Sequence, residues 1–443
     1  MKKIKGLVAT LLAVVGCVAF TGCAELQGLL DEWGLGGFLG DLGLTSSSQS
    51  SSAQSSSLQS SSLQSSSSQS SNSQSSSSQS SSSQSSSSQS SSSIEMGGGD
   101  ITAGAGNLTA DEIQEITTSK LSVHFLELGN KYTGDCTLIK VGNTEVLIDA
   151  GSRKGSAGTI VPYVQNYCTD GVLEYVVATH AHQDHIAGFV GTNDYPGVLE
   201  SFVCQTIIDY PLTNATSVIR SDYEELRSAE VQSGATHYTA LQCYNQTDGA
   251  SRTYTLGEGV QMHILYQKFY EIQTSDENDY SVCLLISAGE DNYLFTGDLE
   301  KEGEESLVES NALPKCVLFK GGHHGSPTSN TTALLDVIRP EMVCVCCCCG
   351  SDEYTDNVAN MFPSQDFVDK IAPYTDKVYV TTIVDDSKEG YTSMNGNIIV
   401  YYDKLEKVQV RCSNNATLFK DTDWFKNNRT LPDAWKSKDT TEE

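Results

Sequence analysis

Short apolar runs alternate with longer amphipathic stretches between about residues 120 and 412. The runs have the length and the Val, Ile and Leu content of buried strands, whereas the stretches have the length of helices. Predicted strands cover residues 122–128, 136–141, 145–148, 174–179, 202–209, 261–266, 282–287, 292–295, 317–319, 342–349, 378–382 and 398–402. Predicted helices cover residues 159–167, 222–232, 301–309, 331–338 and 365–371. This alternation predicts one layered α/β domain.

Residue types that bind metals follow three of the predicted strands. Strand 174–179 is followed by His180, His182, Asp184 and His185. Strand 292–295 is followed by Asp298, and strand 317–319 is followed by His323 and His324. Strand-end loops on one edge of a layered α/β fold converge on a single site. Imidazole and carboxylate donors at this density suit zinc, so we predict a metal site. The alternatives are a polar loop that happens to be rich in His and, for His323 and His324, a polar helix start.

The N-terminus has the pattern of an export signal. Three early lysines precede an apolar stretch, Leu7 to Phe20, that is too short to cross a membrane comfortably. The stretch ends in Phe20-Thr21-Gly22-Cys23, which resembles a bacterial lipobox. We therefore expect residues 1–22 to be removed and Cys23 to carry a lipid on the outer face of the membrane. Ordinary signal-peptide cleavage, giving a secreted protein, is the alternative.

The region after Cys23 predicts a tether followed by an acidic domain. We expect residues 23–44 to lie close to the membrane and the uncharged Ser/Gln tract and Gly hinge within 45–106 to stay disordered. The net charge of −29 therefore falls mostly on the predicted domain, 120–412, which a polar tail, 413–443, follows. Such a body repels phosphates at long range and is a poor general nucleic-acid binder, although bound metal ions reverse the sign locally.

A run of cysteines, Cys346 to Cys349, ends the predicted strand 342–349. Adjacent side chains on a strand point to opposite faces, so these thiols cannot jointly hold one metal without distortion. We favour a strand that uses Cys as a small apolar residue over a metal or redox site. Disulfides are permitted outside the cell, but no framework spacing is visible.

Several motifs together resemble the metallo-β-lactamase-fold hydrolases, most closely the hydrolase domain of ComEC-type DNA-uptake (competence) proteins. These motifs cover about residues 122–403 and are Val123-His124-Phe125-Leu126-Glu127-Leu128-Gly129, Gly134-Asp135-Cys136, Leu147-Ile148-Asp149-Ala150-Gly151, the His cluster at 180–185, Asn278-Asp279-Tyr280-Ser281, Thr296-Gly297-Asp298 and Lys320-Gly321-Gly322-His323-His324-Gly325-Ser326. The resemblance implies a four-layer αβ/βα sandwich with two metal ions between its sheets, with zinc as the expected metal and manganese as the alternative.

The same resemblance implies a role for each motif residue. The expected ligands are His180 and His182 for the first ion, and Asp184 and His185 for the second. Asp298 is expected to bridge the two ions, and His323 or His324 is expected to complete the ligands of the second ion. Asp184 and His324 are the expected catalytic residues, and Asp149 is expected to orient a ligand His. A water activated by the metal ions would be the nucleophile.

Two departures from the family pattern concern the site. The superfamily usually has a further His between the cluster and the bridging Asp, where this chain has only His237 and His263. A lone His of this kind is more often structural than a ligand. The family's late His-Pro pair is Phe362-Pro363 here. The missing His leaves open whether one of the two metal positions is occupied. The change from His-Pro to Phe362-Pro363 leaves open one of the family's substrate contacts.

These features predict an exported, metal-dependent hydrolase, preferably a phosphodiesterase or nuclease. The expected substrate contacts are Asn278, Ser281, Lys320 and Ser326. Nucleic acid and a cell-envelope polymer are the candidate substrates. The alternatives are a phosphorylcholine-esterase-like cell-envelope hydrolase and a non-catalytic, surface-displayed binding domain with a structural metal.

Overall fold

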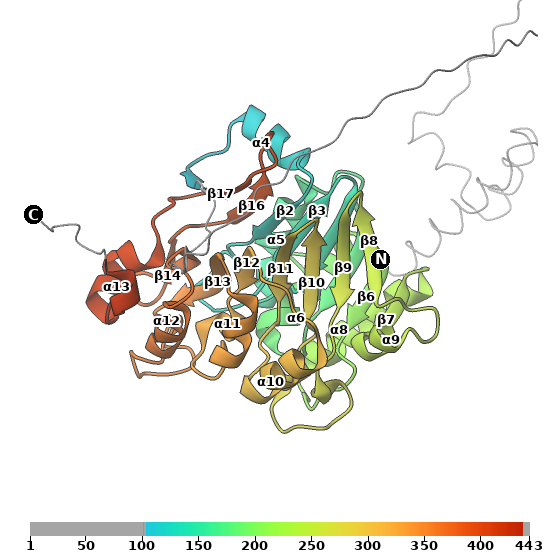
Figure 1. Cartoon of the computed structure of the whole chain (residues 1–443). Coiled ribbons are helices and arrows are strands. Elements are labelled where there is room, and N and C mark those ends of the chain that lie inside the picture. Colours follow the sequence, from blue (N-terminus) through green and yellow to red (C-terminus); the bar gives the residue numbers. More distant parts are fainter. Residues whose placement is uncertain (1–100, 102, 437–443) are drawn as a thin grey trace, which may run out of the picture. The chain divides into compact units, whose positions relative to one another are not determined.

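Two large sheets stacked face to face form the centre of the domain (Figure 1). The computed structural model describes residue 101 and residues 103–436. The strands of the first sheet, in spatial order, are β1 (Ala103–Ala105), β17 (Val408–Cys412), β16 (Ile398–Tyr402), β2 (Ser122–Phe125), β3 (Thr137–Val141), β4 (Thr144–Ile148), β5 (Val172–Ala178), β6 (Val203–Asp209) and β7 (Thr236–Thr239). Those of the second are β15 (Tyr391–Ser393), β14 (Val378–Val384), β13 (Met342–Cys349), β12 (Leu318–Lys320), β11 (Asp291–Phe295), β10 (Leu284–Ala288), β9 (Val260–Ile264) and β8 (Thr253–Gly257).

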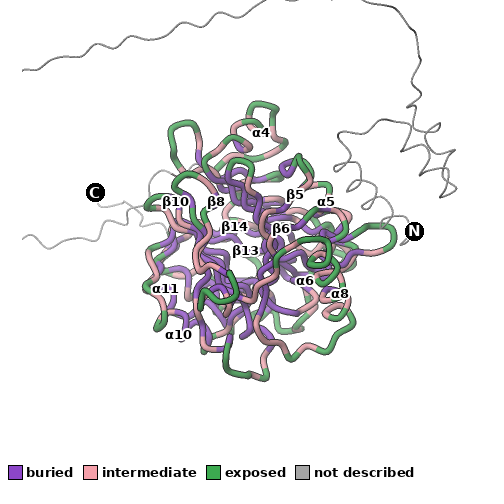
Figure 2. Tube along the Cα trace, turned by 90° about the vertical axis from the view of Figure 1, so that its right-hand side faces the viewer, coloured by how far each residue is buried: buried purple, intermediate pink, exposed green. Residues whose placement is uncertain are grey.

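Helices cover the outer faces of both sheets and complete four layers. In Figure 2, α10 and α11 lie on one side of the buried strands, and α5, α6 and α8 lie on the other. The α-helices are α4 (Ala110–Thr117), α5 (Ala157–Gln165), α6 (Gln183–Val190), α7 (Val198–Ser201), α8 (Val218–Gln232), α9 (Ala240–Asn245), α10 (Lys301–Ser310), α11 (Thr332–Ile338), α12 (Gln365–Ile371) and α13 (Asp423–Asn428). The predicted layered αβ/βα sandwich is confirmed.

The two hydrophobic cores explain the cysteine run. Strand β13 is buried along its whole length. Its even-numbered residues Cys344 and Cys346 contribute to the core shared with the first sheet, whereas Cys347 and Cys349 pack in the core beneath α10 to α13. All cysteines in the described part of the chain are buried and have free thiols. Alternation of side chains across a strand thus makes these cysteines packing residues of two separate cores.

The sequence located most elements to within a few residues, but the folded region extends beyond the predicted limits, 120 and 412, at both ends. Strand β1 pairs in parallel with β17, and α4 precedes β2, so the fold begins before residue 120. At the other end, Phe419, Phe425 and Trp435 are buried in the second core. Residues 413–436 therefore differ from the predicted polar tail, because three aromatic side chains anchor an otherwise polar segment.

Several N-terminal predictions lie outside the described residues. They are the signal peptide 1–22, the lipid at Cys23, the segment 23–44 and the Ser/Gln tract. Among the helices that the structure describes, none combines the length and the apolar character needed to cross a bilayer.

Candidate metal centre

The His cluster joins the end of β5 to the start of α6. His180 follows the strand, His182 is the N-cap residue of α6, and Asp184 and His185 lie in the first helical turn. Because the helix begins within the motif, the cluster is partly helical rather than the loop that the sequence indicated. The close approach of a second motif requires glycine, since a Cβ on Gly151 would overlap the Asp184 carbonyl. The Leu-Ile-Asp-Ala-Gly motif therefore packs directly against the metal motif.

Asp298 lies at the centre of the side chains that converge. Its Oδ2 is 3.0 Å from His185 Nε2, 3.0 Å from His324 Nε2 and 3.9 Å from His323 Nε2. Asp184 Oδ2 lies 3.4 Å from the same His324 nitrogen. Asp298 follows β11, whereas His324 lies in a short 3-10 turn, Gly322–Gly325, after β12. The structure thus brings together the three strand ends that the sequence had singled out.

The cluster's first two histidines form a second group beside this one. His180 Nε2 is 3.1 Å from His182 Nδ1, and the His180 ring lies 4.1 Å from the His185 ring. Ser281 Oγ lies 3.3 Å from His180 Nδ1 and accepts a hydrogen bond from the backbone N–H of Asp298. The two groups of possible ligands are therefore adjacent, and Ser281, which precedes β10, contacts both His180 and Asp298.

Two further carboxylates support the histidines from behind. Asp149 Oδ2 lies 2.8 Å from His185 Nδ1, and Asp149 also accepts hydrogen bonds from the N–H and hydroxyl of Thr179. Asp135 Oδ1 lies 3.2 Å from His324 Nδ1, a nitrogen that is also 2.8 Å from the Cys346 carbonyl. Each supported histidine therefore has its Nδ1 occupied and its Nε2 directed at Asp298, as in carboxylate–histidine–metal arrangements.

His323 and His324 differ in their surroundings. His324 is fully buried, whereas His323 is partly exposed at the cavity, with its Nδ1 3.3 Å from Glu300 Oε1. Both residues have left-handed backbone conformations, with φ of 47° and 53°. Of the two candidates that the sequence left open, His324 has the position of a ligand beside Asp298.

The electrostatic environment favours a cation at this centre. Burial alone would lower the pKa of His185, yet the Asp298 and Asp149 carboxylates raise it well above its usual value. The same balance raises the pKa of the buried His324, which faces Asp298 and Asp135. Carboxylates that raise a pKa in this way stabilise any positive charge at the same place, including that of a metal ion.

The residues present fit divalent metal ions. Asp298 Oδ1 and His324 Nε2 are both buried without a hydrogen bond of good geometry, although each lies near an opposite charge. Buried polar atoms of this kind require a partner. Asp135, His185, Asp298 and His324 each offer a ligand atom, and these four atoms lie within 4.8 Å of one another. A mixed set of imidazole and carboxylate donors suits zinc and other divalent transition metals.

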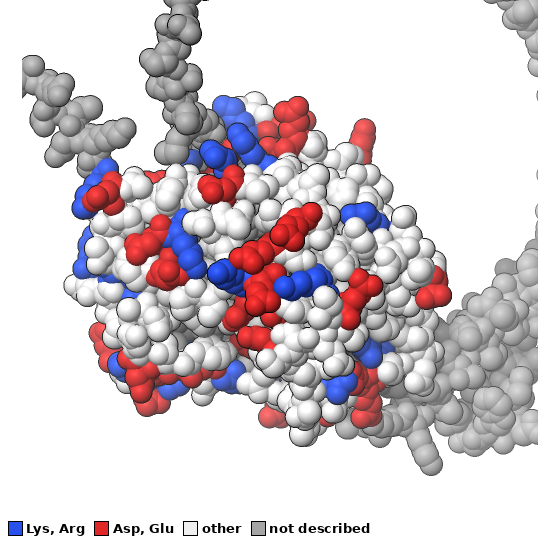
Figure 3. Space-filling view, turned by 60° about the horizontal axis from the view of Figure 1, so that its bottom comes forward, with Lys and Arg blue, Asp and Glu red and all other residues white. Residues whose placement is uncertain are grey.

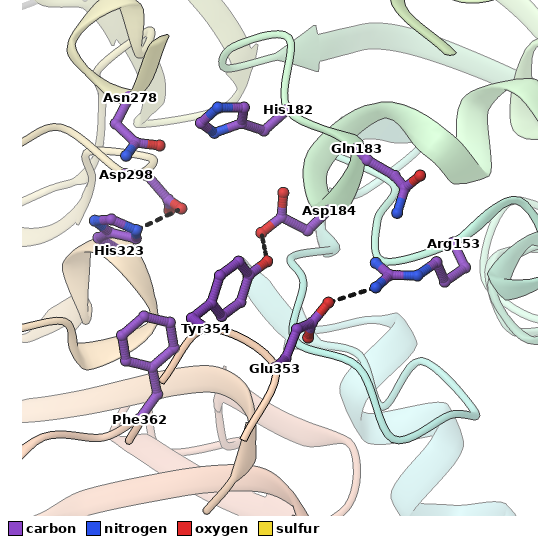
Figure 4. A pocket seen from close by; sticks show the side chains of 10 residues that line it. All are labelled: Arg153, His182, Gln183, Asp184, Asn278, Asp298, His323, Glu353, Tyr354 and Phe362. Carbon is purple, nitrogen blue, oxygen red and sulfur yellow. Dashed lines mark hydrogen bonds and ion pairs between the residues drawn. The ribbon is translucent and has the colours of Figure 1, made fainter. Parts of the chain in front are cut away.

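A cavity of about 570 Å³ opens onto this centre (Figure 4). His182, Asp184, Asp298 and His323 form part of its lining. Tyr354 points at Asp184 from the opposite wall, beside Phe362. The rest of the lining is Arg153, Gln183, Asn278 and Glu353.

The expected substrate contacts are only partly on this cavity. Asn278 lines it, whereas Ser281, Lys320 and Ser326 are buried outside its lining. Lys320 forms an ion pair with Asp135, and Ser281 contacts His180 and Asp298. These two side chains therefore support the metal centre from within the domain. Ser326 lies 2.8 Å from the Thr328 hydroxyl and stabilises its own loop.

Neither intermediate histidine reaches the site. His237 lies on β7 with its Nε2 2.8 Å from Asp209, and His263 lies on β9 between the hydroxyls of Thr253 and Ser287. Both histidines therefore pair with side chains away from the proposed centre. Residues 277–280 form a short 3-10 turn before β10, and Ser281, which follows this turn, lies next to His180.

Sequence reasoning did not single out five residues of the centre and its cavity as functional, namely Asp135, Arg153, Gln183, Glu353 and Tyr354. Asp135 and Gln183 lie in motifs on which the family resemblance rests, so the sequence could have indicated them. The other three are isolated polar or aromatic residues in loops, and no spacing in the sequence relates them to the cluster.

Comparison with known proteins agrees with this geometry. A sequence model described as the metallo-beta-lactamase superfamily matches residues 129–191, which contain the Asp-Ala-Gly motif and the His cluster. The domain has the metallo-β-lactamase fold. Among solved structures, the metallo-β-lactamase-fold protein YhfI from Bacillus subtilis is similar with a TM-score of 0.35 and 11% identity, over 61% of this chain and 98% of that one.

Curated relatives of this chain are named for recombination and competence. Recombination protein 2 of Haemophilus influenzae is 26% identical over 237 residues, which are 52% of this chain and 25% of that protein. Competence protein ComA of Neisseria gonorrhoeae is 27% identical over 213 residues, 47% of this chain and 25% of that protein. The chain thus spans about a quarter of the length of these relatives.

Proposed function

We propose that this chain is a metal-dependent hydrolase. The observation that supports it best is the meeting of Asp298, His324 and the His cluster, which come from three strand ends, beside one cavity. In this proposal His180 and His182 would hold one ion, Asp184, His185 and His324 would hold the other, and Asp298 would be a further ligand at this centre. A purely structural zinc needs four ligands and no open cavity.

The chain's own residues prepare this centre for chemistry. When bound, two divalent cations would supply Lewis acidity and activate water for an in-line displacement. Asp149 and the Cys346 carbonyl fix the orientation of His185 and His324 through their Nδ1 atoms. Asn278 and His323 line the cavity and are placed to contact a substrate. Zinc is the proposed metal and manganese the alternative.

We propose a phosphodiester as the bond that is cleaved. The names of the relatives favour nucleic acid as the substrate. The net charge of −29 favours instead a small or surface-fixed substrate, such as a cell-envelope polymer of the phosphorylcholine-bearing kind. Figure 3 shows the face that lies at the bottom of Figure 1. Acidic side chains gather near the middle of this face, beside a few basic ones.

Export and anchoring belong to the same proposal. The N-terminal pattern would place the enzyme at the outer face of the cell membrane, with a lipid on Cys23 and the Ser/Gln tract as tether. Cys23→Ser should move the protein from the membrane fraction to the medium if this is so.

The function is tested by metal analysis together with hydrolysis of bis-p-nitrophenyl phosphate. Asp184→Ala should lower turnover by more than about 100-fold, because loss of outer partners alone costs about 10- to 100-fold. Asp194→Ala changes an exposed carboxylate outside the cavity and should behave as wild type. Bound metal with wild-type turnover no higher than that of Asp184→Ala would instead support a structural metal in a binding domain. Assays on plasmid, single strands and teichoic-acid release would then choose among substrates.

A further inference from the structure

The segment that follows β13 brings Tyr354 to the metal centre. Its phenol O–H donates a hydrogen bond of 2.8 Å to Asp184 Oδ2 (Figure 4). The same Asp184 oxygen lies 3.4 Å from His324 Nε2. A carboxylate oxygen has two lone-pair directions, so it can accept the phenol proton and still face the centre. The contact therefore bears on which way the Asp184 carboxylate points.

Neighbouring contacts hold Tyr354 in this position. Glu353 forms an ion pair with Arg153 and accepts a hydrogen bond of 2.9 Å from the backbone N–H of Thr133. The Arg153 guanidinium also lies 3.9 Å over the Tyr132 ring. These contacts tie the loop to the opposite wall of the cavity.

The aromatic ring of Tyr354 is held as well. It lies 5.5 Å from the Phe362 ring, which in turn lies 5.7 Å from the His323 ring. A side chain that is 53% exposed would otherwise exchange between rotamers. The packing and the Glu353 tether thus limit that freedom and keep the phenol directed at Asp184.

We propose that Tyr354 is a positioning residue for Asp184, and that the Arg153–Glu353 ion pair holds it in place. This proposal rests on the proposed metal centre. Hydrogen bonds to a ligating carboxylate fix its orientation, and their loss typically weakens metal binding by about 10- to 100-fold. Tyr354 would act through Asp184 rather than by contact with the reacting atoms.

The test is a titration of metal-free protein with zinc and with manganese against a competing chelator. Tyr354→Phe removes only the hydroxyl and should weaken the affinity for one of two ions by about 10- to 100-fold. Glu353→Gln loses the ion pair but keeps the phenol, so its loss of affinity should be smaller. Tyr195→Phe is the matched control, because Tyr195 is equally exposed at 53% and lies outside the cavity lining.

The outcomes separate this proposal from the proposed function. Urea unfolding of the metal-free variants should match wild type, which excludes a general loss of structure as the cause. Wild-type affinity for both ions in Tyr354→Phe would overturn the role of Tyr354 and leave the metal centre standing. A wild-type chain that binds no divalent metal would overturn the proposed function and this proposal together.

Discussion

At the scale of single residues, Asp149 shows how the backbone prepares the site. It follows β4 with a left-handed φ of 58°, and this conformation turns its carboxylate toward Thr179 and His185. Asp and Asn tolerate that conformation better than most residues. One carboxylate thereby fixes both the end of β5 and the orientation of a proposed ligand.

Asp149→Asn should weaken metal binding by about 10- to 100-fold, because His185 loses its charged acceptor. Asn keeps the size of the side chain and tolerates the positive φ, so the local fold should persist. Chelator competition measures the effect. Asp209→Asn is the matched control, since Asp209 is also buried and pairs with a histidine, His237, at a place away from the cavity. Equal losses in both variants would contradict a specific role for Asp149.

Residues of the site could be predicted from the sequence where several donors share a short motif. The His cluster met that condition, whereas Asp298 is a single donor that was recognised because it follows a predicted strand in the Thr-Gly-Asp motif. Tyr354 could not be recognised in either way, because its contact with Asp184 joins residues 170 positions apart and depends on how a long loop folds back. Lys320 lay in a recognisable motif but was assigned to the substrate, whereas its burial and its ion pair with Asp135 show that it faces Asp135 instead.

At the scale of elements, a buried histidine joins β2 to α5. His124 Nδ1 lies 2.9 Å from the Tyr163 hydroxyl on α5, and Nε2 lies 2.9 Å from the Ser122 hydroxyl. Burial and the nearby Lys140 ammonium lower the pKa of His124 to about 3. The neutral ring is therefore the form that the packed interface requires.

This interface should make stability depend on pH. The unfolded chain binds a proton at His124 near pH 6.5, and the folded chain binds it only near pH 3. Stability is then complete above about pH 6.5 and falls as the pH falls toward 3. Between pH 8 and 5, wild type should lose about 2 kcal/mol more than His124→Gln.

Urea unfolding in the presence of a chelator measures this difference without metal release. At pH 8 the two proteins should differ only by a constant offset. Parallel curves from pH 8 to pH 5 would show that His124 does not titrate with folding.

Elements at the ends of the domain were the ones that the sequence missed. Strand β1 is three residues long and gains its partner, β17, from the other end of the chain. The C-terminal segment is polar on average, yet Phe425 and Trp435 are buried. Local patterns cannot predict such elements, because their stability comes from contacts that are distant in sequence.

At the scale of the whole molecule, charge and chemistry oppose each other. The proposed centre would attract phosphates once metal ions are bound, whereas the domain around it is acidic. The Ser/Gln tract from Thr45 to Ser93 carries no charge, so it neither adds to nor offsets the negative charge of the domain. The long-range field therefore acts on polymers more than on small substrates.

Ionic strength should separate these effects. As salt rises from about 10 to 150 mM, the screening length falls from about 30 to 8 Å. The kcat/KM for duplex DNA should rise over this range because repulsion between polymer and domain is screened, while that for bis-p-nitrophenyl phosphate should change less. Steady-state assays at fixed metal concentration test this, with potassium chloride as the salt. A value for duplex DNA that instead falls with salt would mean that a basic surface recruits the polymer, and nucleic acid would then become the favoured substrate.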